Sequence, residues 1–171
     1  MVKWLPVLHW LLDNIPFARQ NRRRQRKAMT LTELLIVISL IGILMGIAVP
    51  MYTNHLARAR NTVAIGDIYE IGLQIMVYMT DRGELPQTLE EVGWGKRSDP
   101  WGNLYQYFRI EGAKGKGKMR KDRFMVPLNT DFDLYSMGKD GKSVMPLTAK
   151  DSRDDILRAN NGGYIGLGSK F

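Results

Sequence analysis

The chain has 171 residues, a formal net charge of +8 at pH 7 and no cysteine. This length allows one small domain and a membrane anchor, and the lack of cysteine excludes a disulfide framework and a cysteine nucleophile. With only two histidines, His9 and His55, and no Walker or Gly-x-Ser-x-Gly motif, no catalytic set is visible. The sequence therefore predicts a protein that is not an enzyme.

The positive charge is concentrated at the N-terminus. Residues 1–28 contain seven Lys or Arg and one acidic residue, whereas residues 29–171 contain eighteen and sixteen. Cations beside an apolar run keep their end of a membrane span in the cytoplasm. The distribution therefore predicts that the C-terminal part lies outside the cytoplasm, and it argues against nucleic acid as a partner.

An uncharged run from residue 34 to residue 57 follows these cations. A bilayer crossing needs about 20 apolar residues, so the run is long enough to span a membrane. Glu33 stands at its edge, where a carboxylate costs about 2–3 kcal/mol or more and is expected to have a partner and a function.

Residues 27–38, Lys-Ala-Met-Thr-Leu-Thr-Glu-Leu-Leu-Ile-Val-Ile, resemble the processing site of type IV pilins and type II secretion pseudopilins. The resemblance implies that a prepilin peptidase cleaves between Ala28 and Met29, that Met29 is then N-methylated, and that Glu33 steers assembly. Ala28 and Met29 replace the family's usual Gly and Phe, but a small residue still precedes an apolar one. In a filament of identical helices, the amino group of a neighbour's Met29 would neutralise Glu33 and fix the register between subunits.

Two other interpretations of this stretch stay open. A secretory signal peptide would be cleaved after Ala48, and a plain signal anchor would stay uncut. We favour the filament subunit, because Glu33 would interrupt the apolar region of a signal peptide and has no use in a monomeric anchor.

One helix is predicted from Met29 to the Asp81-Arg82-Gly83 sequence. Residues 29–53 would form the transmembrane and polymerisation helix and residues 54–82 an amphipathic stalk, with a kink rather than an end at Pro50. Apolar residues beyond the span recur at intervals that predict one buried face, formed by Leu56, Ala59, Val63, Ile68, Ile71, Ile75 and Met79.

Residues 83–171 are predicted to form a small head with an antiparallel sheet, so the fold class is α+β. A short helical turn is expected at residues 88–92. Alternating and aromatic residues predict three strands, and a Gly- and Lys-rich hairpin connection is expected between the first two, at residues 112–122. The predicted strands are residues 104–110, 123–126 and 132–136.

Three blocks in the head, in this order, resemble the major pseudopilin, or G component, of type II secretion systems: residues 99–107, 132–141 and 154–156. The resemblance implies a calcium ion that ties the loop after the last strand to a later acidic turn. Its ligands would be oxygen atoms, which calcium prefers. They would come from Asp140, the Met137 backbone carbonyl, Asp154 and Asp155.

The shell of this calcium site is not fully defined by the resemblance. Residues 142–153 replace the usual Gly-rich stretch, so three further residues are reserve ligands: Asp133, Asp151 and Ser152. Alternatively, Asp154 and Asp155 only cap a last helical turn.

Together these features predict a structural filament subunit, the major pseudopilin of a type II secretion-type pseudopilus that drives protein export. It would be a single-pass inner-membrane protein with a periplasmic head, whose leader, residues 1–28, is removed by the prepilin peptidase. Its partners would be further copies of itself, minor pseudopilins and the inner-membrane assembly platform. The alternatives are a pilin of a type IV pilus or other extracellular filament, and a monomeric membrane-anchored calcium-binding module. A DNA-binding minor pilin would depend on the cations of residues 114–123, and we expect no specific binding to nucleic acid.

Overall fold

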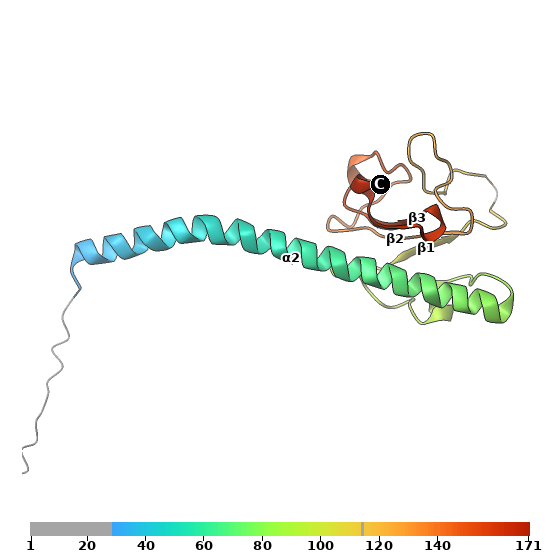
Figure 1. Ribbon diagram of the computed structural model, residues 1–171, viewed down its shortest axis with the longest axis horizontal. Helices are drawn as coiled ribbons and strands as arrows, with labels where there is room; N and C mark the ends of the chain where they lie inside the picture. Colours follow the sequence, from blue (N-terminus) through green and yellow to red (C-terminus); the bar gives the residue numbers. More distant parts are fainter. Residues whose placement is uncertain (1–28, 114) are drawn as a thin grey trace, which may run out of the picture. The chain divides into compact units, whose positions relative to one another are not determined.

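A computed structural model describes residues 29–113 and 115–171 (Figure 1). The chain divides into two compact units, residues 1–44 and residues 45–171. Helix α2 (Leu31–Arg82) contributes its first turns to the first unit and the rest to the second, and all the described strands belong to the second unit. A long apolar helix with a small antiparallel sheet confirms the α+β class. The predicted leader lies outside the described residues.

Helix α2 begins directly after Thr30 and continues through Pro50, which lacks a backbone N–H but does not end the helix. Every side chain from residue 31 to residue 60 is exposed in the single chain. The helix is long and apolar enough to cross a membrane. It ends at Arg82, where Gly83 adopts φ +77° and its N–H donates to the carbonyl of Met79 over 2.8 Å.

The head contains a four-stranded antiparallel sheet in which each strand pairs with the next one along the chain. The strands are β1 (Gln106–Arg109), β2 (Phe132–Ser136), β3 (Ile156–Ala159) and β4 (Tyr164–Leu167). The register pairs Gln106 with Tyr135, Ser136 with Ile156, and Ala159 with Tyr164. Short 3₁₀ turns complete the head: η1 (Leu89–Val92), η2 (Lys150–Ser152), η3 (Asn160–Gly162) and η4 (Gly168–Lys170).

Two of the three predicted strands are confirmed as β1 and β2, and η1 confirms the predicted helical turn. The predicted strand at residues 123–126 is wrong. This segment is a turn in the β1–β2 connection, in which Arg123 has φ +41° and Phe124 is fully exposed. Strands β3 and β4 were not predicted, because their sequences, Ile-Leu-Arg-Ala and Tyr-Ile-Gly-Leu, do not alternate between apolar and polar.

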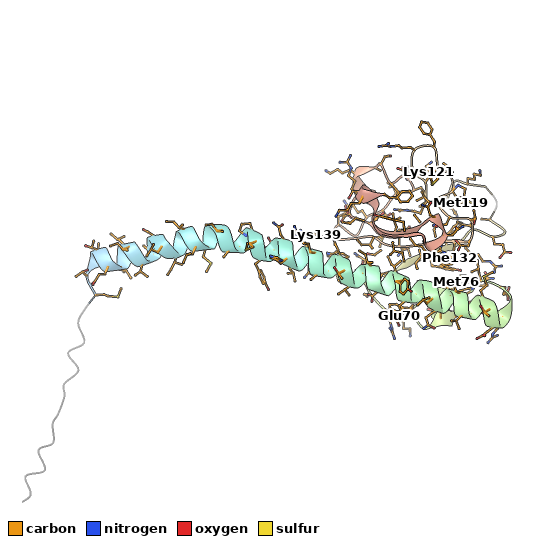
Figure 2. All side chains as sticks on the ribbon, in the orientation of Figure 1. Glu70, Met76, Met119, Lys121, Phe132 and Lys139 are labelled. Atoms are coloured by element: carbon orange, nitrogen blue, oxygen red, sulfur yellow. The ribbon has the colours of Figure 1, made fainter. Side chains whose placement is uncertain are left out.

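The main core lies between helix α2 and one face of the sheet. Figure 2 labels Phe132 on β2, where it is completely buried against the helix residues. The buried helix residues are Ala64, Ile68, Ile71 and Ile75, and the sheet contributes Phe132, Leu134 and Ile156. A smaller cluster includes Leu128, Leu147, Leu157 and Ala159.

The predicted buried face of the helix is only partly right. Ile68, Ile71 and Ile75 are fully buried, whereas Val63 and Met79 are 53% and 42% exposed. Ala64 is buried instead of Val63, which the spacing had predicted for the buried face. A polar contact fastens the same helix to the head, because the Tyr105 hydroxyl donates to Asp67 Oδ2 over 2.5 Å.

Replacing a core residue of α2 should destabilise the head far more than replacing its exposed neighbour. Ile71→Ala should lower the free energy of unfolding by about 2–5 kcal/mol, because it removes buried methyl groups and leaves a cavity. Leu73→Ala is the matched control, since Leu73 is 49% exposed, and should change it by about 0.5 kcal/mol or less. Denaturant unfolding of the full chain in detergent, followed by near-ultraviolet circular dichroism, measures both, and equal losses would contradict this core.

Candidate functional site

The predicted assembly residue, Glu33, lies in the first turn of α2 and is bonded to Thr30. The backbone N–H and the hydroxyl of Thr30 both donate to Glu33 Oε2, each over 2.8 Å. The Glu33 N–H donates in return to Thr30 Oγ1 over 3.2 Å. This reciprocal arrangement is a capping box, which satisfies backbone donors at a helix start and places a carboxylate at the positive end of the helix dipole.

The capping box was not part of the sequence prediction, although its Thr-x-x-Glu signal at residues 30–33 is visible. It gives Glu33 a local role in the single chain. Met29, the predicted new N-terminus, precedes the helix and is exposed. Ala28, on the other side of the predicted cleavage point, lies outside the described residues.

In the head, the first of the three sequence blocks is bonded to the second. Asp99 Oδ1 accepts the N–H groups of Trp101 and Asn103 over 3.0 and 2.8 Å, and Asp99 Oδ2 accepts the Ser136 hydroxyl. The Asn103 side-chain amide then donates to the Gly138 carbonyl over 2.8 Å. The Asp99 turn therefore supports the base of the loop that follows β2, which we call the aspartate loop, residues 137–155.

The aspartate loop is closed at its far end by Asp154. Asp154 Oδ2 accepts the N–H groups of Lys139 and Asp140 over 2.8 and 3.1 Å. Asp140 Oδ1 accepts the Lys142 N–H over 2.9 Å within the loop. The structure thus brings Asp140 and Asp154 together, as the resemblance implied. The alternative that Asp154 caps a helical turn is wrong, since β3 follows it.

The fourth predicted ligand, Asp155, is engaged elsewhere. Its side chain is completely buried, and its Oδ2 accepts Arg120 Nη2 and the Ser143 hydroxyl, each over 2.6 Å. Burial raises the pKa of Asp155 above its ordinary value, whereas the hydrogen bond from Ser143 and the charge of Arg120 lower it. Sequence reasoning missed Arg120, because nothing in its neighbourhood distinguishes it from the other cations of its loop.

The reserve ligands are also bonded within the protein, apart from Asp151, which lies half-buried in η2. Asp133 is buried and accepts the Arg120 backbone N–H over 2.7 Å and the Asn129 side-chain amide over 2.9 Å. The Ser152 hydroxyl donates to the Val144 carbonyl over 2.7 Å.

Among the residues that the structure describes, no group of three or more His, Cys, Asp or Glu side chains is placed to hold a metal ion. Met137 directly follows β2, with Asp140 and Asp154 nearby, but Asp155 is bonded to a guanidinium. Of the predicted ligands, Asp140 and Asp154 therefore lie together, whereas the Asp155 carboxylate is paired with Arg120.

A long apolar helix with a capped glutamate at its start and a small antiparallel sheet packed on its second half define the class of type IV pilin-like proteins. The family model described as the prokaryotic N-terminal methylation motif matches residues 23–49, which include the predicted processing site and Glu33.

Among curated relatives, type II secretion system core protein G of Pseudomonas aeruginosa is 32% identical over 142 residues, which cover 71% of this chain and 89% of the relative. The protein of the same name from Aeromonas hydrophila is 27% identical over 143 residues, with the same coverage. A fimbrial protein of Neisseria meningitidis is 31% identical over 88 residues, 52% of each chain. No solved structure matches the chain. The chain belongs to the family of type II secretion system core protein G.

The aspartate loop should tolerate no side chain at Gly138. Gly138 has φ +63°, and a Cβ there would lie 2.3 Å from the Asp154 carbonyl oxygen. Gly112→Ala is the matched control, because Gly112 has φ +77° but open space around it. The control should cost about 1–2 kcal/mol of unfolding free energy from backbone strain alone. Gly138→Ala should cost clearly more in denaturant unfolding of the full chain, and equal costs would show that the contact with Asp154 is unimportant.

Proposed function

We infer that the protein is a structural filament subunit, the major pseudopilin of a type II secretion-type pseudopilus, which assembles through its N-terminal helix to support protein export. The observation that carries this inference is the start of α2. There, a single glutamate stands before an apolar helix segment whose side chains are all exposed in the single chain. The chain is similar to type II secretion core proteins G over most of its length.

The exposed segment needs a non-aqueous partner. Leu, Ile and Val side chains of residues 34–47 are exposed by 40–66% of their area, and apolar surface of this extent is unfavourable in water. Lipid covers it in the membrane-inserted subunit. Packing against the same segment of neighbouring copies covers it in a filament, so one surface serves both states.

Glu33 distinguishes the filament from a plain anchor. In the single chain its two recorded side-chain acceptor contacts come from Thr30 and both use Oε2. Those contacts satisfy hydrogen bonds but supply no positive ion. In the filament, the amino group of a neighbour's Met29 would neutralise the carboxylate in a medium of low dielectric constant and set the axial position of one subunit against the next.

This role requires that Met29 carry a free or methylated amino group. A prepilin peptidase that cleaves between Ala28 and Met29 would provide it, and the match to the N-terminal methylation motif supports such processing. The cations of residues 22–27 would hold the uncut end in the cytoplasm. The head would then lie in the periplasm, and assembly would involve an inner-membrane platform and minor pseudopilins.

A pilin of a type IV pilus is the second candidate, favoured by the similarity to fimbrial proteins. That similarity covers about half of this chain, whereas the similarity to core protein G covers 71% and so includes part of the head. The longer match favours the pseudopilus.

Replacing the assembly glutamate should separate membrane insertion from polymerisation. We expect Glu33→Gln and Glu33→Ala to insert into the membrane but to abolish filaments, because neither side chain carries the negative charge that forms an ion pair with a neighbour's amino group. Ser39→Ala is the control, since the Ser39 hydroxyl donates only within its own helix, to the Leu35 carbonyl over 2.7 Å. Membrane fractionation and electron microscopy of sheared filaments measure the two steps, and normal filaments from either Glu33 variant would refute this role.

A further inference from the structure

We propose that Arg120 supplies the buried cation that closes the aspartate loop, so that the head of this protein folds and keeps its loop without calcium. This reverses the expectation that the resemblance raised for the loop. It concerns the folding of the head alone and does not depend on the proposed function.

Arg120 is built into the head rather than placed on its surface. It is only 2% exposed, and its partner Asp155 is completely buried. Its guanidinium donates through Nη2 to Asp155 Oδ2 over 2.6 Å, and through Nη1 to the Val144 carbonyl over 3.1 Å and to the Ser143 hydroxyl. The guanidinium carbon also lies 4.2 Å from the centre of the Tyr135 ring, a cation–π contact.

These contacts join three separate segments of the head. Arg120 lies in the β1–β2 connection and Tyr135 in β2, while Ser143, Val144 and Asp155 belong to the aspartate loop, with Asp155 at its end directly before β3. A cation that ties a loop after β2 to the acidic residue before β3 is what calcium was expected to provide. Arg120 makes the same connection with a side chain of the chain itself.

The backbone around Arg120 is also hydrogen-bonded to β2 and to the aspartate loop. The Arg120 N–H donates to Asp133 Oδ2 over 2.7 Å. The next residue pairs with the aspartate loop, because the Lys121 N–H donates to the Met145 carbonyl over 3.1 Å and the Leu147 N–H donates to the Lys121 carbonyl over 2.9 Å. Figure 2 labels Lys121 and Met119, the two neighbours of Arg120, in the head. The main chain that carries the Arg120 side chain is therefore held in place next to the aspartate loop.

Residues 142–153 fit this arrangement. They provide Ser143 and Val144 as partners of Arg120. Ser152 links the two ends of the segment, since its hydroxyl donates to the Val144 carbonyl over 2.7 Å and accepts the Val144 N–H over 3.0 Å. The segment is thus closed by protein groups.

The two buried polar atoms without partners in this region are complementary. Arg120 Nε is a donor and Asp155 Oδ1 is an acceptor, and both belong to this ion pair. A small rotation toward the side-on fork that Arg and carboxylates often form would satisfy both. A calcium ion at Oδ1 would instead lie beside a guanidinium that touches Oδ2 of the same carboxylate, where the two cations repel each other at low dielectric constant.

The test uses the full chain in detergent and compares excess calcium with excess EGTA. Wild-type protein should show the same midpoint of thermal unfolding in both, and the same amide hydrogen exchange across residues 139–157. A midpoint that rises by several degrees in calcium, or exchange in the loop that slows with calcium, would overturn the proposal.

Variants of Arg120 provide the second half of the test. Arg120→Gln should lower the midpoint by about 10 °C or more, because it leaves Asp155 as a buried charge without a counter-ion. Arg123→Gln, an exposed cation in the same connection, is the matched control and should have little effect. The double variant Arg120→Gln/Asp155→Asn should recover part of the loss. If Arg120→Gln does not fold, recovery in the double variant still supports the ion pair. Two results would refute it: a double variant as unstable as Arg120→Gln, or an Arg120→Gln midpoint equal to that of the control.

Discussion

The structure depends on one constraint: a single helix must present an exposed apolar surface along its first part and a buried face to the head along its second part. Over residues 31–60 its side chains are all exposed in the single chain, and the surface that they present is mainly apolar. Over residues 64–75 the same helix provides four completely buried side chains to the core of the head. Both parts belong to one α-helix, Leu31–Arg82. The head is therefore fixed to the helix, while the first part of the helix is left for lipid or for other copies.

The head is held together by buried charges as well as by its apolar core. Arg120 pairs with Asp155, and Arg158 of β3 pairs with Asp131 over 2.7 Å while its guanidinium lies 4.1 Å from the centre of the Phe132 ring. A small domain buries limited apolar surface. Arginine suits such sites, because its planar guanidinium can bond carboxylates and stack on aromatic rings together.

The helix and the first two strands could be predicted from the sequence because their patterns are local. An uncharged run, spacing of apolar residues and a Gly after Arg82 are all visible along the chain. Strands β3 and β4 could not, since Arg158 and Gly166 interrupt any alternation; β3 forms by pairing with β2, and β4 by pairing with β3. Of the predicted buried face, only Ile68, Ile71 and Ile75 are buried, because spacing defines neither which side a sheet will cover nor how far along the helix it reaches. The other predicted residues are exposed: Leu56, Ala59, Val63 and Met79.

The start of α2 and the aspartate loop also differ in how much of each could be predicted from the sequence. Glu33 stands out because a charge beside an apolar run is unusual within a few residues of sequence. The partner of Asp155 lies 35 residues away in a loop with several cations, and only the folded arrangement distinguishes Arg120 from them. A resemblance carried over residue by residue does not reveal that the Asp155 carboxylate is bonded to Arg120, from another loop.

The central claim is that this chain is processed into a filament subunit with Met29 at its N-terminus. The intact mass of the protein extracted from membranes, with and without a prepilin peptidase, tests it most directly. The account predicts a species that begins at N-methylated Met29 and disappears when the peptidase is absent. A species that begins at Val49, or a chain that stays uncut in the presence of the peptidase, would contradict it.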